Sequence, residues 1–176
     1  MRNLFLLLAT MLRLFRQRTA SETERIAYYP DVEHGRDVRL TGDVNFGSEP
    51  FLVSLGSRVT IADGVRFITH DGAVRVLRDE LPDLHLYGPI KVGDDVFIGV
   101  SAIIMPNVSI GNRSIIGAGS VVTRSVPAGE VWAGVPARRI RTIDEYRASA
   151  IRESFRWEPG DYGPRWREEL VKRFGQ

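Results

Sequence analysis

Cysteine is absent from the 176 residues of the chain. Its absence excludes disulfide bonds, cysteine metal ligands and a thiol nucleophile, and it fits the reducing cytoplasm, where we expect this protein to reside. Histidine is scarce, because the chain contains only His34, His70 and His85. Any reaction that depends on an imidazole must therefore use one of these three side chains.

Long hydrophobic runs are also lacking, since no segment approaches the roughly 20 apolar residues that a membrane-spanning helix needs. The most apolar stretch, residues 4–15, is shorter than this and is followed by Arg16 and Arg18. Because residues 1–20 carry four arginines and no acidic residue, we expect an amphipathic helix over residues 1–18. Such a helix either packs in an oligomer or makes peripheral contact with a membrane.

A large excess of one charge is missing too, because the formal net charge is only +2. Residues 21–137 hold 10 basic and 15 acidic side chains, whereas residues 138–176 hold 10 basic and seven acidic ones. The whole chain is therefore not a polycation, and we expect no nucleic-acid partner. The basic ends are either ordinary solvated surface or a surface that meets a phosphate-bearing ligand.

The middle of the chain contains a repeat with a period of six residues. Every sixth residue is a β-branched aliphatic in the series Val92, Ile98, Ile104, Ile110, Ile116 and Val122. The following residue is glycine in four of these six hexads, which relieves crowding where a backbone turns. A period of six suits neither an α-helix nor an alternating strand. It is typical of short strands that meet at the corners of a triangular coil, with identical side chains stacked at the strand spacing of ~4.8 Å.

The same ladder appears earlier at Leu55, Ile61 and Phe67, and more weakly at Leu40 and Phe46. Residues 71–89 interrupt it with charges and a proline, so we expect a loop extruded from one corner. The sequence thus predicts a mainly β fold, a parallel β-helix over residues 35–137. A helical segment, residues 1–34, precedes it, and a helical tail, residues 138–176, follows it.

Several motifs resemble those of a known family. They are Val59-Thr60-Ile61, Phe67-Ile68-Thr69-His70-Asp71-Gly72, Val96-Phe97-Ile98-Gly99, residues 116–123 and residues 133–138. Over residues 38–141 the chain is similar to the hexapeptide-repeat, or isoleucine-patch, acyltransferases, especially the sugar O-acetyltransferases. The resemblance implies a left-handed β-helix, a homotrimer, and acetyl-CoA and a sugar or glycan acceptor bound between neighbouring prisms. No metal is required.

Acyl transfer from a thioester to a hydroxyl needs a base for the hydroxyl proton and a donor for the oxyanion. His70 ends a repeat coil where the interruption begins, so it lies at a prism corner beside a loop that can form a pocket wall. The resemblance places the catalytic base here, and we expect His70 to deprotonate an acceptor that attacks the thioester directly. The alternative is a turn histidine that only hydrogen-bonds. Asp71 either orients the imidazole or shapes the turn.

Three residues are candidates for contact with the acceptor: Glu49, Asn45 and His85. Glu49 lies roughly one coil before His70, and several relatives use an asparagine near that place. His85 lies in the extruded loop, where it either touches the acceptor or is an ordinary loop residue.

The resemblance assigns the coenzyme A site to Phe97, Val100, Ala118, Thr123, Arg138 and Arg141. The backbone N–H of Val100 would stabilise the oxyanion, and Phe97 would pack on the pantetheine arm. Arg138 and Arg141 would bind the nucleotide phosphates, because a guanidinium fork suits phosphate. The structural alternatives are a surface aromatic, small corner residues and a solvated basic tail.

We expect transfer of an acetyl group to a hydroxyl of a sugar or polysaccharide precursor, and the alternative is transfer to the nitrogen of an amino sugar or sugar nucleotide. Two further functions are less well supported. A γ-type carbonic anhydrase needs three zinc-binding histidines, and His34 and His85 lie outside the repeat. The fourth function is a non-catalytic β-helix scaffold, against which His70, Arg138 and the motif around Ala118 argue.

Overall fold

The computed structural model describes residues 20–157 and 162–175. The amphipathic helix expected over residues 1–18 lies outside the described residues. Within the described ranges, no helix is both long and apolar enough to cross a membrane.

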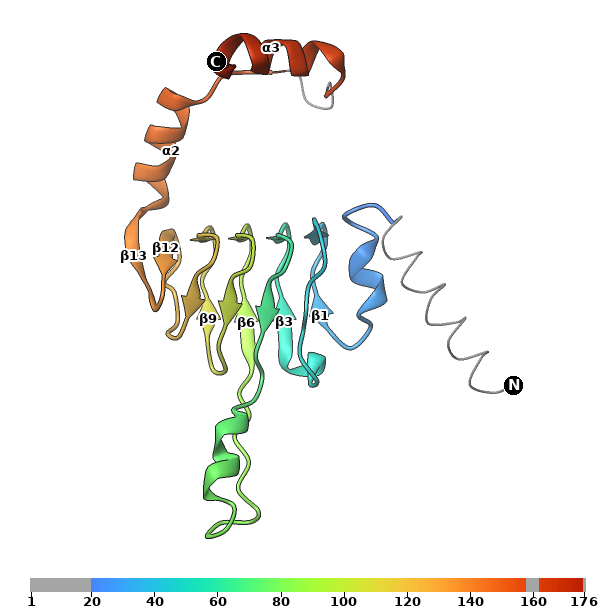
Figure 1. The fold of residues 1–176 in the computed structure, drawn as a ribbon, viewed down its shortest axis with the longest axis vertical. Helices are drawn as coiled ribbons and strands as arrows, with labels where there is room; N and C mark the ends of the chain where they lie inside the picture. The colour runs from blue at the N-terminus through green and yellow to red at the C-terminus, as the bar shows by residue number, and fades with distance from the viewer. Residues whose placement is uncertain (1–19, 158–161, 176) are drawn as a thin grey trace, which may run out of the picture.

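The chain winds into a prism of three sheets made of very short strands (Figure 1). Sheet A contains β1 (Glu33–His34), β3 (Val53–Leu55), β6 (Ile90–Val92) and β9 (Ser109–Ile110). Sheet B contains β2 (Arg39–Leu40), β4 (Thr60–Ile61), β7 (Phe97–Ile98), β10 (Ile115–Ile116), β12 (Glu130–Gly134) and β13 (Ala137–Thr142). Sheet C contains β5 (Arg66–Phe67), β8 (Ile103–Ile104) and β11 (Val121–Val122). From β3 to β11 successive strands visit the three sheets in turn and pair in parallel, which confirms the parallel β-helix. Its left-handed winding stays a prediction from the resemblance.

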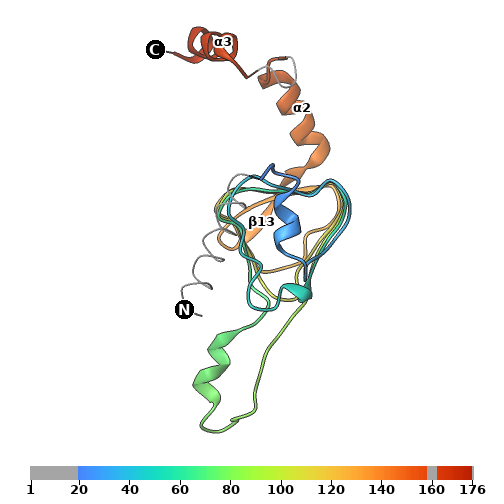
Figure 2. The ribbon, with the colours of Figure 1, turned by 90° about the vertical axis from the view of Figure 1, so that its right-hand side faces the viewer.

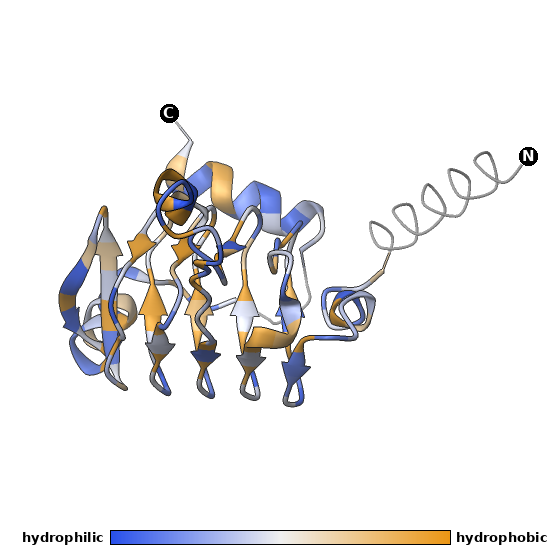
Figure 3. Cartoon of the chain, turned by 90° about the horizontal axis from the view of Figure 1, so that it is seen from below, coloured by the Kyte–Doolittle hydropathy of each residue, from blue (hydrophilic) through white to orange (hydrophobic). Residues whose placement is uncertain are grey.

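The six-residue ladder forms the core. Ile61, Ile98 and Ile116 are paired across neighbouring strands of sheet B, and each is fully buried. Phe46 stacks on Phe67 with ring centroids 5.0 Å apart, so the weaker early hexads belong to the same core. Figure 3 shows the strands of successive coils side by side, with hydrophobic segments recurring along the row. Burial of equivalent aliphatic side chains in each coil supplies most of the driving force for this stack.

The coils stack closely at the corner between sheets B and C. A Cβ on Gly99 would lie 2.6 Å from the backbone nitrogen of Ala118 in the next coil. Ser101 at the same corner has a φ of 57°, and the Ala102 N–H donates to the Gly99 carbonyl at 3.2 Å. A side chain at Gly99 would therefore collide with the backbone of the next coil.

The corner between sheets C and A is interrupted by the extruded segment, which leaves the outline of the prism in Figure 2. Its base is a pair of antiparallel chains. The Asp71 N–H donates to the Leu86 carbonyl at 2.9 Å, and the Gly88 N–H donates to the Thr69 carbonyl at 2.8 Å. Beyond this base the segment forms the 3-10 helix η3 (Gly72–Leu77).

The described residues on either side of the prism are only partly helical. Within residues 20–34 the structure contains the 3-10 turn η1 (Arg25–Tyr28), and residues 33–34 form β1, which pairs with β3. After it, residues 138–142 are not helical, because β13 returns antiparallel along β12 and satisfies its backbone groups there. Helix α2 (Ile143–Glu153) begins only at Thr142, where a reciprocal capping box with Glu145 starts it. Helix α3 (Pro164–Phe174) follows.

Candidate active site

His70 is held by a carboxylate from the preceding coil. Its Nδ1 lies 3.0 Å from the Glu49 Oε2, in the turn that precedes the 3-10 helix η2 (Pro50–Leu52). The His70 side chain is 44% exposed and the Glu49 side chain 18% exposed. With Nδ1 facing the carboxylate, Nε2 is the nitrogen left to take a proton from a substrate.

Glu49 is itself fixed by Thr69. The Thr69 hydroxyl donates to the same Glu49 Oε2 at 2.6 Å, and Thr69 is fully buried. This hydrogen bond is the largest of the influences that lower the pKa of Glu49, and the hydrogen bond from His70 adds to it, while burial opposes both. Glu49 is therefore ionised at neutral pH and serves as the anionic partner of the imidazole.

Glu49 was predicted to contact the acceptor, but in the structure its carboxylate contacts His70 and Thr69. Asp71 takes the other of its two predicted roles. Its Oδ1 accepts from the Ala73 N–H at 2.9 Å, so it shapes the turn that starts η3. The carboxylate beside the histidine comes from a neighbouring coil and not from the neighbouring residue.

A cavity of about 290 Å³ opens beside His70. The extruded segment supplies most of its wall, and the lining is His70, Asp71, Gly72, Val74, Arg75, Arg78, His85, Leu86 and Tyr87. The Tyr87 ring lies 6.0 Å from the His70 ring and 6.1 Å from the His85 ring, measured between centroids. The structure therefore brings His85 to the same cavity as His70, and contact of His85 with the acceptor stays a prediction.

A second cavity of about 310 Å³ shares Asp71, Leu86 and Tyr87 with the first. Its remaining wall comes from the next two coils, at Met105, Pro106, Asn107 and Thr123. Thr123, expected in the coenzyme A groove, thus lies at the corner of the prism that carries His70.

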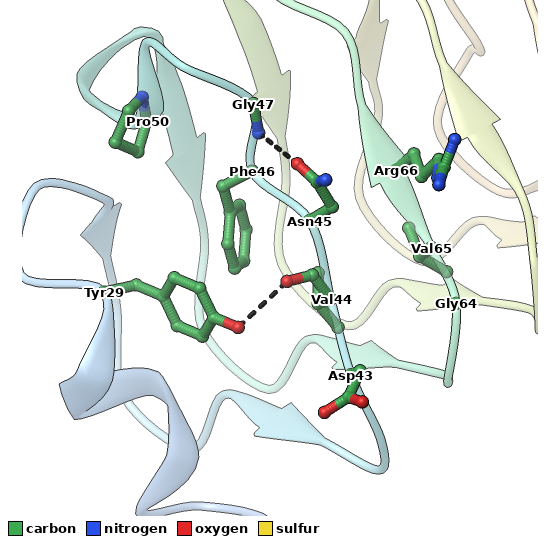
Figure 4. Close-up of a pocket in the computed structure, with 10 residues that line it drawn as sticks. All are labelled: Tyr29, Asp43, Val44, Asn45, Phe46, Gly47, Pro50, Gly64, Val65 and Arg66. Atoms are coloured by element: carbon green, nitrogen blue, oxygen red, sulfur yellow. Dashed lines mark hydrogen bonds between the residues drawn. The ribbon is translucent and has the colours of Figure 1, made fainter. Parts of the chain in front are cut away.

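The largest of these cavities, about 440 Å³, lies elsewhere (Figure 4). Phe46 and Tyr29 line it on one side and Arg66 on another, and the Tyr29 hydroxyl donates to the Val44 carbonyl at 2.9 Å. Asn45 lines this cavity, where its Oδ1 accepts from the Gly47 N–H at 2.7 Å. Asn45 is therefore not among the residues that line the cavities beside His70.

Phe97, Val100 and Ala118, three of the residues predicted to bind coenzyme A, lie along another edge of the prism. Phe97, on the outer face of sheet B, is 44% exposed, and Val100, at the corner between sheets B and C, is 49% exposed. Ala118 is exposed at the same corner one coil later. Within residues 20–157 and 162–175, the Val100 N–H makes no hydrogen bond, and the same holds for the Ala118 N–H. The geometry thus offers free amide donors beside an apolar edge.

Arg141 is aligned with Phe97 by the strand register. Phe97 pairs with Ile115, Ile115 with Val131, and Val131 with Arg141. Three strand spacings of ~4.8 Å separate the aromatic ring from the arginine by roughly 14 Å. Arg141 Nη1 donates to the Ser149 hydroxyl at 2.9 Å, while its Nε is buried without a partner.

Arg138 is exposed near this end of sheet B, and the only hydrogen bond of its side chain within the described ranges is from Nη1 to the Ala137 carbonyl, at 2.8 Å. Its neighbour Arg139, by contrast, forms an ion pair with Glu130 at 3.1 Å. Arg138 therefore keeps most of its N–H donors available for phosphate oxygens.

The described part of the chain contains no cluster of three or more His, Cys, Asp or Glu side chains able to hold a metal ion. A base with a free nitrogen, an ionised partner and an adjacent cavity instead suit proton transfer from a small acceptor.

Comparison with known proteins extends this description. Residues 89–124 match the family model described as bacterial transferase hexapeptide (six repeats). The chain is 43% identical to Protein CapG of Staphylococcus aureus over 122 residues, which is 68% of this chain and 71% of CapG. It is 37% identical to the galactoside O-acetyltransferase of Escherichia coli (strain K12) over 97 residues, which is 55% of this chain. That match covers 47% of the galactoside enzyme, so this chain spans about half of it.

Among solved structures, a hexapeptide-repeat-containing acetyltransferase from Vibrio cholerae superposes with a TM-score of 0.56 and 26% sequence identity. The superposition covers 77% of this chain and 89% of the Vibrio chain. The prism seen here is therefore the fold of a hexapeptide-repeat acetyltransferase.

Proposed function

Because this chain belongs to the hexapeptide-repeat transferase family and is an acyltransferase, we propose that it moves an acetyl group from acetyl-CoA to a hydroxyl of a sugar or polysaccharide precursor. The observation that carries the proposal is the His70–Glu49 pair, 3.0 Å apart and beside an open cavity. A hydroxyl is a poor nucleophile at neutral pH, and a positioned imidazole with an ionised partner is what its activation needs.

The geometry of the His70–Glu49 pair supports a route for the proton of the acceptor hydroxyl. His70 Nε2 takes the proton of the acceptor hydroxyl as the oxygen attacks. The positive charge that then develops on the imidazole is stabilised by Glu49, to which Nδ1–H donates. Thr69 holds the carboxylate in place and keeps it ionised. No covalent bond between enzyme and acetyl group is needed.

The edge of the prism that carries Phe97, Val100 and Ala118 suits the binding of acetyl-CoA. When acetyl-CoA is bound, the acceptor oxygen forms a bond to its thioester carbonyl carbon and the carbon–sulfur bond breaks. The departing coenzyme A sulfur would receive the proton that His70 took from the acceptor hydroxyl, which returns the imidazole to its neutral form. The free N–H of Val100 donates to the carbonyl oxygen as negative charge develops on it. The exposed Phe97 packs on the pantetheine arm, and Arg138 and Arg141 face the phosphates at the end of the same sheet.

The acetyl donor and the acceptor meet between copies of the chain. In one prism, His70 lies at the corner between sheets C and A, whereas Val100 lies at the corner between sheets B and C. A homotrimer, as the family resemblance implies, brings the His70 corner of one copy to the Val100 corner of the next. Partly exposed Ile103 and Val121 on the outer face of sheet C supply apolar surface for that contact.

The test is release of free thiol from acetyl-CoA against a panel of sugars, amino sugars and sugar nucleotides, with mass spectrometry and NMR of the product. We expect acetylation of a sugar oxygen. Acetylation of an amino nitrogen in preference to every hydroxyl would replace the proposal by its N-acyl alternative. Thiol release that no acceptor accelerates would contradict both.

A further inference from the structure

We infer that the acceptor carries an anionic group, a carboxylate or a phosphate, which Arg75 and Arg78 bind in the cavity beside His70. The inference rests on the proposed transfer at His70 and adds the charge class of the acceptor to it. Both arginines line the cavity of about 290 Å³ that also contains His70 and His85.

The local structure places the two arginines on one side of the segment. Arg75 lies within η3, and Arg78 is its C-cap residue with a helical backbone. Side chains three residues apart in a 3-10 helix are eclipsed, so these two point in similar directions. The Arg78 N–H donates to the Arg75 carbonyl at 3.3 Å, which keeps the last turn intact. The base of the segment in turn fixes η3 relative to His70 through the pairing of His70 with Tyr87.

Neither guanidinium is neutralised by the part of the chain that the structure describes. Arg75 and Arg78 form no ion pair or side-chain hydrogen bond there, whereas Arg58 forms a two-point pair with Asp95 at 2.6 and 2.7 Å. The Nε of Arg78 is buried and has no acceptor. A buried N–H without a partner is unfavourable, and a bound oxyanion would satisfy it.

The acidic residues of the extruded segment do not supply that partner. Asp79, Glu80 and Asp83 are exposed and do not line the cavity. Asp71 does line it, but one of its oxygens accepts from the Ala73 N–H. The cavity thus presents two guanidinium groups and one carboxylate, with His85 beside them, and an anionic ligand complements this arrangement.

A sugar with a carboxylate or phosphate fits this position better than the phosphates of coenzyme A. The arginines share their cavity with the base that must meet the acceptor hydroxyl, while Arg138 and Arg141 lie at the far end of sheet B. The anion would anchor one end of the acceptor while a hydroxyl reaches His70 Nε2.

The test compares Arg75→Gln, Arg78→Gln and the double variant with Arg36→Gln, an exposed arginine at the corner between sheets A and B. Each enzyme is assayed with matched methyl glycosides, methyl glycuronides and sugar 1-phosphates of gluco, galacto and manno configuration. We expect an acidic sugar to be the better acceptor of wild type. Loss of either arginine should raise its KM roughly 10- to 100-fold with little change in kcat, as for a lost charged hydrogen bond. The KM of acetyl-CoA, and every constant of Arg36→Gln, should stay unchanged. The glycuronide and phosphate arms identify which anion is bound.

Binding to the enzyme without acetyl-CoA provides a second readout. Calorimetry should show the acidic sugar binding to wild type and to Arg36→Gln, and weakly or not at all to the double variant. Equal use of neutral and acidic acceptors, unaltered in the variants, would overturn the inference and leave the acetyl transfer standing. A rise in the KM of acetyl-CoA alone would assign the arginines to the donor. If no sugar of either charge is acetylated, the proposed function fails, and the calorimetric result alone decides whether the arginines bind an anion.

Discussion

The corner that carries His70 and the corner that carries Val100 arise from the same six-residue repeat, yet they are built in opposite ways. At the Val100 corner the turns are short and rich in glycine, and the free groups that they offer are backbone amides. At the His70 corner the repeat is interrupted, and the groups that form the site are side chains from residues 49, 69–87 and 123. A regular stack can position backbone donors at every coil, whereas an acid–base group and an acceptor pocket need an irregularity.

The largest effect on activity is expected at the His70 corner. His70→Ala removes the proposed base, and we expect kcat to fall roughly 10²- to 10⁴-fold. The affinity for acetyl-CoA and the melting temperature should stay near wild type, because His70 is partly exposed and outside the core. Thiol-release kinetics and calorimetry measure these quantities. His34→Ala, at an exposed histidine on another sheet, is the matched control, and full activity of His70→Ala would refute the role of His70 as base.

At the Val100 corner, removal of one backbone hydrogen-bond donor should lower the activity. Val100→Pro removes the N–H, and proline suits the second position of the turn from Gly99 to Ala102, whose third residue has positive φ. We expect kcat to fall roughly 10²- to 10³-fold, as for loss of an oxyanion donor. Val100→Ala keeps the N–H and should keep most of the activity. Similar kcat values for the two variants at equal melting temperature would count against the amide.

Substitution of a glycine should lower the stability of the fold more at the Val100 corner than in the extruded segment at the His70 corner. A Cβ at Gly99 would meet Ala118 backbone at 2.6 Å, so Gly99→Ala should lower the free energy of unfolding by about 1–3 kcal/mol through overpacking. A Cβ at Gly72, in the extruded segment, would meet nothing within 4 Å, and Gly72→Ala should change it by less than about 1 kcal/mol. Urea denaturation measures both, and equal losses would mean that the regular corner is not the tighter one.

The smallest expected effect is on the stability of the fold at acidic pH. The pKa of Glu49 is lowered, chiefly by the Thr69 hydroxyl, so the ionised carboxylate stabilises the fold above the ordinary value of 4.5. This stabilisation is lost as pH falls from there through the lowered pKa. Thr69→Val keeps the shape and removes the hydroxyl, so its unfolding free energy should depend less steeply on pH in this window. Denaturant unfolding at pH 7 and at several pH values below 5 provides the comparison. An unchanged slope would show that Thr69 does not set the ionisation of Glu49.

The repeat predicted the regular part of the molecule because each hexad is a local signal. Ile98 and Ile116 lie 18 residues apart, which is three hexads, and the structure stacks them. The same count places Thr123 three hexads after Met105, at the His70 corner. The sequence alone therefore indicated that Thr123 and Ala118 lie at different corners of the prism.

The partnership of Glu49 with His70 and Thr69 had no comparable signal. The turn between β2 and β3 differs in length from the later ones, so the position of Glu49 relative to the next coil depends on how that turn folds. The arginines at 138, 139 and 141 were read as part of a helical tail, because no hexad marks a strand that turns back along β12. Contacts set by irregular turns are where the pattern alone was insufficient.

We propose that the two corners perform separate tasks and meet between copies of the chain. To test this, His70→Ala and Val100→Pro chains are mixed by co-expression, and thiol release by the purified mixed oligomers is measured. Each variant alone should be nearly inactive, whereas a mixed oligomer contains an interface with an intact His70 and an intact Val100. We predict that mixing restores a substantial fraction of wild-type activity. Mixed oligomers, verified by native mass spectrometry, that stay as inactive as their parents would contradict an active site shared between copies of the chain.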